Sequence, residues 1–119
     1  MLTGFFDSAG RPRLTVTVTG GRSTAQVDAL IDTGFNGDLT LPISLAVRLG
    51  LELMAQVAVE LADGSVKSEL VFSGSAAIGA RARRVRIGLT AADDAFVGTG
   101  LLSRHRVNMD FRKGTITLT

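Results

Sequence analysis

The sequence predicts a mostly β fold, a barrel or a sandwich, with one or two short helices. Apolar and polar residues alternate along much of the chain, which is the period of a strand with one buried face. The alternating segments are short and are separated by turns rich in glycine, and 14 of the 119 residues are glycine. Many short strands joined by such turns are typical of β-barrels and β-sandwiches.

Local signals place the individual elements. Leu14, Val16 and Val18 alternate with threonines, a pattern that predicts a half-buried strand. Asp63 and Gly64 stand between two alternating arms and predict the tip of a hairpin. In chain order, the first expected elements are a hairpin of strands 13–20 and 24–32, a short strand 38–42, a helix 43–50 ended by its glycine, and a hairpin over 56–72. Two strands within 75–89, broken near Gly79, follow. The last are a strand end with a turn and a short helix over 91–105, and a closing hairpin of 106–111 and 114–119.

The composition is that of one folded domain, which we expect to span residues 1–119. Hydrophobic residues make up 45% of the chain and charged residues 20%, a balance that allows a buried core and differs from that of a disordered protein. Cysteine is absent, which excludes disulfides, thiolate metal sites and cysteine nucleophiles. No signal peptide and no apolar run long enough to span a bilayer is recognisable, so we expect a soluble, cytoplasmic protein.

The charge balance does not favour a nucleic-acid-binding role. The pI is about 9.9, yet the net charge is only +2. Arg81, Arg83, Arg84 and Arg86 fall in a predicted strand, with two arginines on each face and no aromatic residue among them to stack bases. We interpret them as the charged residues of a solvated edge strand in preference to a phosphate-binding site. A basic nucleic-acid-binding β-barrel is the alternative, and strong salt-dependent binding of DNA or RNA would identify it.

One apolar stretch ends at Asp32, which is followed by Thr33 and Gly34. A carboxylate at the end of a core strand is costly to desolvate and is kept there only with partners. The glycine lets the backbone turn sharply, so that amide groups point at the carboxylate, and the threonine hydroxyl can brace the loop. In the simplest alternative, the tripeptide is only a turn capped by the aspartate.

The chemistry of this carboxylate requires a second one. Two carboxyl groups that share one proton can activate a water and protonate the oxygen of a peptide bond, whereas one alone is a poor catalyst. A faint internal repeat of the Asp32 region has Gly-Thr-Gly at 98–100, without an aspartate, and Asp93 and Asp94 precede it in a predicted polar loop. The sequence therefore predicts a dimer in which Asp32 of each copy lies on the two-fold axis.

These motifs resemble those of the retropepsin-like aspartic proteases, the single-domain relatives of pepsin that include retroviral proteases and bacterial homologues. From about Arg13 to Phe111, "ALIDTGFNGDLTLP" matches the family's catalytic loop, "VELADGSVKSELV" stands where the family has its flap hairpin, and "FVGTGLLSRHRVNMDF" matches the second family motif. The resemblance implies a closed retropepsin-like (acid protease) β-barrel. It also implies a homodimeric aspartic endopeptidase that hydrolyses a peptide or protein substrate without a cofactor or a metal.

The resemblance implies roles for the matched residues. Asp32 would be the catalytic carboxylate, Thr33 would brace the pair of carboxylates across the dimer axis, and Gly34 would supply the turn and an amide. The substrate-binding positions would come from the catalytic loop, from the flap tip that closes over the peptide, and from the second motif that packs beneath the loop. They are Phe35 and Asn36 in the loop, Ala62, Asp63, Gly64 and Ser65 at the tip, and Val97 and Gly98 in the second motif.

The chain departs from the retroviral pattern. Phe35, Asn36 and Gly37 stand where retroviral members have alanine and acidic residues, and Thr99 stands where they have arginine. The ion-pair network of the retroviral dimer is therefore missing, and we expect a different mode of dimerisation. Because the same fold also serves as a peptide-binding or dimerisation module, a non-catalytic role remains the alternative.

The other chemically notable residues have ordinary structural interpretations. His105 is the only histidine and is expected at a solvated helix end, so no zinc site is expected. Asp93 and Asp94 are interpreted as loop residues. The core candidates among the phenylalanines are Phe5, Phe6, Phe72, Phe96 and Phe111.

Overall fold

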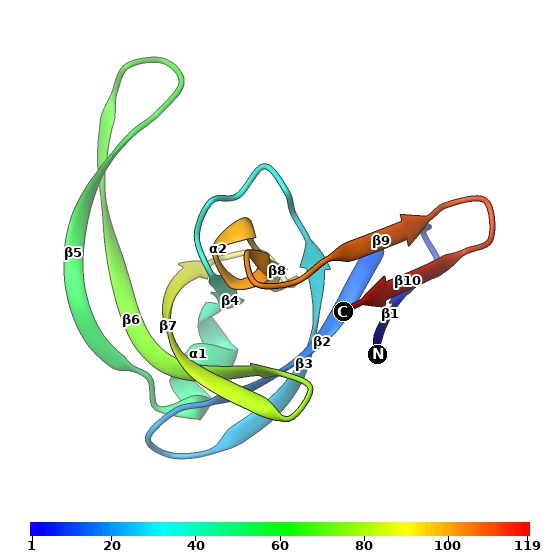
Figure 1. Cartoon of the computed structure of the whole chain (residues 1–119). Helices are drawn as coiled ribbons and strands as arrows, with labels where there is room; N and C mark the ends of the chain where they lie inside the picture. Colours follow the sequence, from blue (N-terminus) through cyan, green and yellow to red (C-terminus); the bar gives the residue numbers. More distant parts are fainter.

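The computed structural model describes all 119 residues as ten strands and two short helices (Figure 1). The strands are β1 (Leu2–Phe6), β2 (Pro12–Thr19), β3 (Thr24–Ile31), β4 (Leu39–Pro42), β5 (Glu52–Glu60), β6 (Val66–Ile78), β7 (Arg81–Thr90), β8 (Phe96–Val97), β9 (Val107–Asp110) and β10 (Thr115–Leu118). The helices are α1 (Ile43–Leu49) and α2 (Thr99–Leu102). The prediction of a mostly β fold with one or two short helices is confirmed.

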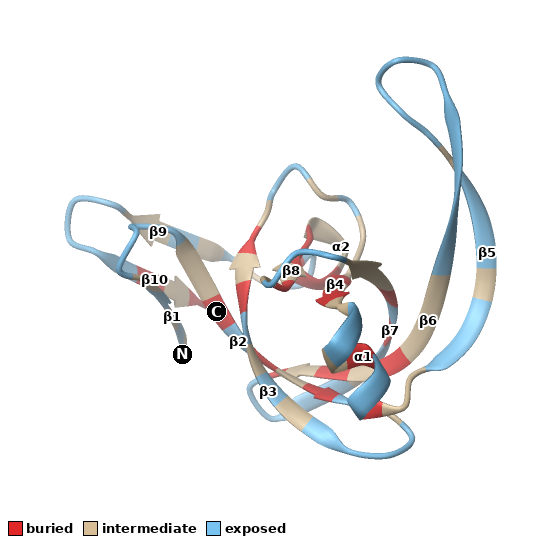
Figure 2. Ribbon diagram, turned by 180° about the vertical axis from the view of Figure 1, so that it is seen from behind, coloured by how far each residue is buried: buried red, intermediate tan, exposed pale blue.

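Six of the strands close into a barrel that surrounds the core. Neighbouring strands follow the order β2-β3-β8-β4-β7-β6, and β6 pairs back onto β2. Leu14, Val16 and Val18 of β2 are at most 1% exposed, so the predicted alternation of this strand is confirmed. Figure 2 shows that most of the buried residues gather inside this ring of strands and on the helix faces that cover it, with further buried residues on β10.

Two parts of the sheet extend beyond the barrel (Figures 1 and 2). The first half of β6 pairs with β5, and these two strands form a long hairpin that is largely exposed on both faces. On the other side, β1 continues from β2 and carries β10 and then β9. The sheet therefore has two free edges, β5 and β9.

Helix α1 follows β4 directly and ends as predicted. Ala46 and Leu49 are buried, and Leu45 packs against the core cluster. Gly50 has φ 68° and ψ 51°, and its N–H donates to the carbonyl of Val47 at 3.2 Å. A glycine adopts this left-handed conformation without the strain that a Cβ would cause, which explains why the helix stops there.

Two elements differ from the sequence predictions. Leu2–Phe6 form β1, whose five residues gave too short a pattern to be recognised and are held by pairing with β2 and β10. The strands expected on either side of Gly74 are one continuous strand, β6. Gly74 marks close packing here rather than a turn, because a Cβ on it would lie 2.9 Å from Cδ1 of Ile87.

The interpretation of the arginine cluster as part of an edge strand holds for that half of β7 and not for the whole strand. Residues 81–86, which carry the four arginines, pair with β6 alone, whereas Ile87 pairs with both β6 and β4 and residues 88–90 pair with β4. The pairing with β4 was not predicted, because β4 comes from a distant part of the sequence.

None of the five phenylalanines expected in the core is fully buried. Phe6 and Phe72 pack against its rim, Phe5 is 39% exposed and Phe111 is 70% exposed, although the rings of Phe6 and Phe111 are 4.9 Å apart. The core is aliphatic, because six strands of small radius leave little room for aromatic rings. Neither helix has the length and apolar composition needed to cross a membrane.

Candidate active site

Asp32 lies directly after β3, where the barrel wall gives way to a loop. We call residues 32–38, which connect β3 to β4, the Asp32 loop. The backbone N–H of Asp32 donates to the carbonyl of Val97 at 3.0 Å, which continues the parallel pairing of β3 with β8. Its carboxylate accepts the N–H of Gly34 at 3.0 Å. The expected contact between this glycine amide and the carboxylate is therefore present, and Asp32 is partly accessible while Thr33 and Gly34 are exposed.

The segment 98–100 holds the Asp32 loop from below. The N–H of Gly98 donates to the carbonyl of Asp38 at 3.0 Å, and the N–H of Gly100 donates to that of Gly37, also at 3.0 Å. Thr99 donates to the carbonyl of Phe35 twice, from its N–H at 2.8 Å and from Oγ1 at 3.3 Å. These bonds satisfy the carbonyl groups of a loop that has no strand partner of its own.

Gly98 lies in close contact with the Asp32 loop. It is buried, and a Cβ on it would clash with the carbonyl oxygen of Gly37 and would lie 2.6 Å from Cδ2 of Phe35. Val97 beside it is fully buried. Both residues therefore lie beneath the Asp32 loop, as the resemblance implied, and they act on the site through the position of the loop.

Two residues that the sequence analysis missed connect the loop to β7. Oδ2 of Asp38 accepts the backbone N–H of Arg86 at 3.0 Å. Nη2 of Arg83 donates to the carbonyl of Gly100 at 2.7 Å and lies 3.6 Å from Oδ1 of Asp38. The sequence carried no signal for these contacts, because they join segments that meet only when the barrel closes.

The Asp32 loop and the tip of the β5–β6 hairpin project from the same side of the molecule (Figures 1 and 2). The tip residues Ala62, Asp63, Gly64 and Ser65 are exposed. Asp63 accepts the N–H of Ser65 at 2.9 Å and its hydroxyl at 2.6 Å, and this hydroxyl contact chiefly lowers the pKa of the Asp63 carboxyl. The tip is thus a defined turn, and it does not line the cavity described next.

A cavity of about 420 Å³ lies between the Asp32 loop and the strands β6 and β7. Phe35 and Phe96 form apolar parts of its wall, and Glu69 and Arg86 contribute opposite charges. Asn36 does not line it and is exposed. The wall is completed by Gly37, Asp38, Leu39, Thr40, Val71, Gly88, Leu89 and Thr90. An extended peptide beside the loop would find both apolar and charged surface here.

No second carboxylate is bonded to Asp32. Asp28 accepts the hydroxyl of Thr15 at 2.7 Å, Asp38 is bonded to β7, and Asp94 is paired with Arg13. Asp93 is exposed, and His105 is half-buried beyond α2. No group of three or more histidine, aspartate or glutamate residues is arranged to hold a metal ion.

An ion-pair network fixes the start of β8, the strand with which β3 and Asp32 pair. The guanidinium of Arg13 lies 2.7 Å from the carboxylate of Asp7 and 2.9 Å from that of Asp94. Asp94 directly precedes Ala95, whose carbonyl accepts the N–H of Leu30. The N–H of Arg11 and then the Arg13 guanidinium hold the pKa of Asp7 well below its usual value, and Arg13 likewise lowers the pKa of Asp94. The same contacts, chiefly that with Asp7, raise the pKa of Arg13.

Comparison with known proteins identifies the family. The family model described as aspartyl protease matches residues 14–106, which include the Asp32 loop, the β5–β6 hairpin and segment 98–100. The chain belongs to the aspartyl protease family. A search of curated proteins found no match to the chain.

The fold of this aspartyl protease family member is also found among solved structures. It is similar to the crystal structure of the retroviral protease-like domain of Ddi1 from Leishmania major, with a TM-score of 0.52 and 17% identity. The match covers 89% of this chain and 87% of the other. The prediction of a retropepsin-like fold is confirmed, and this likeness at low identity concerns the fold alone.

We expect Gly98→Ala to destabilise the protein and to displace the Asp32 loop. The added methyl group meets backbone and a ring packed against it, so the free energy of unfolding should fall by about 1–3 kcal/mol, as for overpacked sites in other proteins. Urea unfolding measures this change, and amide resonances of residues 32–38 report the displacement. Gly88→Ala is the matched control, because a Cβ there would lie at an ordinary 3.6 Å from Oγ1 of Thr40. Equal stability of the two variants would contradict the packing described for Gly98.

We expect Asp94→Asn to lower the melting temperature at pH 7 and to reduce the loss of stability in acid. The pKa of Asp94 is lowered in the folded protein from the ordinary value of 3.8, so its ionised form adds stability above that pH, and this stability is lost as the pH falls through the folded value. The difference in melting temperature between wild type and variant should shrink as the pH falls below the ordinary value of 3.8 and through the lowered folded value. Asp93→Asn, which removes an exposed carboxylate without an ion pair, should show no such difference. A gap between wild type and Asp94→Asn that is constant with pH would contradict the role of the network.

Proposed function

We propose that this chain is an aspartic endopeptidase that acts as a homodimer, with Asp32 of each subunit on either side of one water. The observation that carries the proposal is the presentation of Asp32. Its carboxylate sits at the end of a barrel strand, accepts one amide at 3.0 Å and stays partly accessible. Such a carboxylate is fixed in place and keeps free lone pairs for a substrate water.

The need for a second subunit follows from the chemistry and from the contacts of the other aspartates. Peptide hydrolysis of this type uses two carboxyl groups that share a proton. The aspartates nearest to the loop in sequence and space have partners elsewhere, so the chain offers one free carboxylate at the site. A two-fold axis beside the exposed Thr33 and Gly34 would bring in the Asp32 of the second subunit.

The dyad would work as a combined general acid and base. The ionised carboxylate takes a proton from the water as its oxygen attacks the peptide carbonyl, and the protonated carboxyl gives its proton to the carbonyl oxygen. The resulting tetrahedral diol collapses when the carboxyl that took the water's proton gives it to the leaving nitrogen, one diol hydroxyl returns its proton to the other carboxylate, and the C–N bond breaks. The carboxyl groups then again share one proton, so the cycle needs no cofactor.

The substrate would be an extended peptide held between the Asp32 loop and the hairpin. The 420 Å³ cavity would take one side chain against Phe35, and the tip residues Ala62 to Ser65 would close over the peptide as a flap. Asn36 would contact the substrate from the exposed side of the loop. Val97 and Gly98 would contribute by holding the loop rather than by touching the peptide.

A second candidate function is a non-catalytic module that binds a peptide by strand addition. The observation that favours it is the free edge of β5, which presents unpaired backbone groups along a hairpin with exposed Leu53, Met54 and Val57. Both functions predict peptide affinity. Only the enzyme predicts turnover that depends on Asp32.

We expect Asp32→Asn to abolish cleavage while peptide affinity and melting temperature are retained. The amide has nearly the same shape but cannot take the water's proton, so the rate should fall by at least about 100-fold. The measurement is digestion of a peptide library from acidic to neutral pH at high protein concentration, with Asp93→Asn as the charge-matched control. Equal cleavage by wild type and Asp32→Asn would remove Asp32 from the mechanism. Peptide binding without cleavage by wild-type dimer would support the binding module instead.

We expect Asp32→Asn subunits to inhibit the wild type when the two are mixed. With a nine-fold excess of the variant, a wild-type subunit finds a wild-type partner about one time in ten, so cleavage per wild-type subunit should fall about ten-fold by mass action. The same excess of Asp93→Asn supplies an intact Asp32 and should raise the total activity. Unchanged activity after mixing and re-equilibration with Asp32→Asn would show that each subunit works alone.

A further inference from the structure

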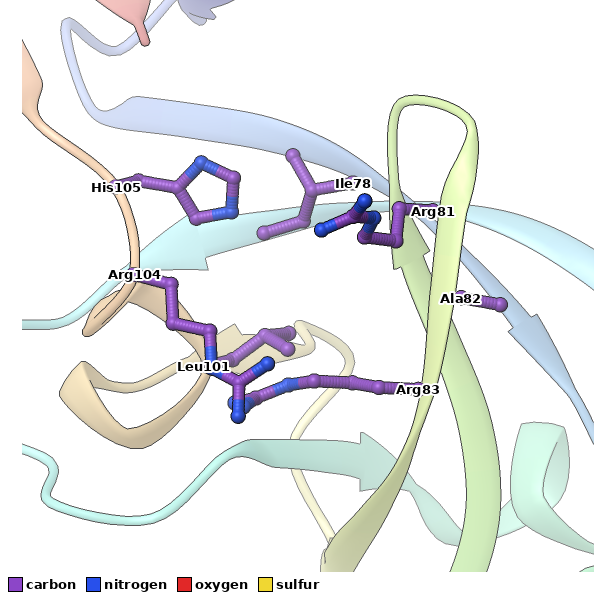
Figure 3. A pocket seen from close by; sticks show the side chains of 7 residues that line it. All are labelled: Ile78, Arg81, Ala82, Arg83, Leu101, Arg104 and His105. Carbon is purple, nitrogen blue, oxygen red and sulfur yellow. The ribbon is translucent and has the colours of Figure 1, made fainter.

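A second cavity, of about 210 Å³, lies apart from the Asp32 loop, between the start of β7 and the segment that follows α2. Four basic side chains line it, Arg81 and Arg83 from β7 and Arg104 and His105 from beyond the helix. Figure 3 shows these side chains extending into the same space from two sides. Ile78 and Leu101, both buried, form its apolar wall.

The positive charge of this cavity is largely uncompensated. No carboxylate belongs to its lining. Arg81 and Arg104 make no ion pair, and the one carboxylate near the group, Asp38, is 3.6 Å from Arg83 and also accepts the Arg86 backbone N–H. Three guanidinium groups around one small space repel one another, and an anion in that space would relieve this repulsion.

We propose that this cavity is a binding site for a compact, multiply charged anion, a phosphate or pyrophosphate group. Guanidinium groups present paired N–H donors that match phosphate oxygens, and such charge-assisted bonds are among the strongest in proteins. The buried apolar wall strengthens them, because it keeps water from one side of the anion. The proposal does not depend on the proposed proteolytic activity.

The size and lining of the cavity select a small anion over a nucleic-acid strand. A cavity of about 150 Å³ holds a benzene ring, so 210 Å³ has room for a phosphate or pyrophosphate group. No phenylalanine, tyrosine or tryptophan lines the space, and the imidazole of His105 is its only ring, so a run of bases would find no stacking surface there. The other two arginines of the cluster, Arg84 and Arg86, line neither wall.

Arg83 would connect the proposed anion site to the Asp32 loop. Its Nη2 donates to the Gly100 carbonyl at 2.7 Å, and Gly100 in turn binds the Gly37 carbonyl in the Asp32 loop. An anion on Arg83 should therefore shift the amide resonance of Gly100 as well as that of His105. These two resonances locate the bound anion independently of any activity.

The test is titration of the full-length protein with inorganic pyrophosphate at constant ionic strength, followed by NMR and calorimetry. We expect saturable binding, with the largest shifts at residues 81–83 and 100–105. Arg104→Gln should weaken binding at least about ten-fold, as expected for loss of a charge-assisted contact. Arg84→Gln is the matched control, because it removes an exposed arginine from the opposite face of β7 and should leave the affinity unchanged.

Three results would overturn the proposal. Without saturable binding by the folded wild type, there is no site. If Arg84→Gln weakens binding as much as Arg104→Gln, the anion is attracted by the general positive charge of the strand. If a single-stranded oligonucleotide binds more tightly than pyrophosphate, with a steep dependence on salt, the surface is a nucleic-acid interface.

Discussion

The parallel pairing of β3 with β8 is the constraint on which the site depends. Because β8 has only two residues, the pairing is short, yet it sets Asp32 beside Val97 and brings segment 98–100 under the Asp32 loop. Four hydrogen bonds from that segment then satisfy the carbonyl groups of the loop, and the Asp38 carboxylate adds a bond to β7. Burial of Val97 in the core ties this arrangement to the stability of the barrel itself. The geometry of the carboxylate is therefore a property of the whole fold rather than of the Asp-Thr-Gly tripeptide.

Local patterns predicted much of the fold and the centre of the site. Alternation identified β2 and β3, Gly50 marked the end of α1, and the apolar run before Asp32 pointed to the loop. Local patterns did not predict the long-range contacts. The contact of Arg83 with Asp38 and the closure of β6 onto β2 involve residues whose neighbours in sequence give no hint of the partner. The expected gap between Phe72 and Ser75 is absent, because a glycine required by packing, here Gly74, looks the same in sequence as one at the end of a strand.

The charged residues form two groups. One group forms ion pairs that hold the site in place, and the other lies unpaired around the second cavity. Asp7, Arg13 and Asp94 compensate one another and hold the start of β8, while Arg83 and Asp38 connect β7 to the base of the Asp32 loop. Arg81 and Arg104, in contrast, line the same cavity, and no carboxylate belongs to its lining. The two kinds of arginine have different consequences, since paired groups preserve geometry whereas unpaired groups create affinity for ions from solution.

The free edge of β5 has a consequence for the handling of this protein in the cell and in the test tube. Glu52 and Glu60 stand only at the ends of the strand, and the stretch between them carries no charge and no proline. Natural sheets normally interrupt such an edge, since open backbone groups beside apolar side chains recruit other strands without specificity, and here the interruption is a β-bulge at Leu53–Ala55 near the start of the strand. High protein concentration therefore favours open-ended association through the edge of β5. We expect such edge pairing to lower the solubility of the protein even where its fold is intact.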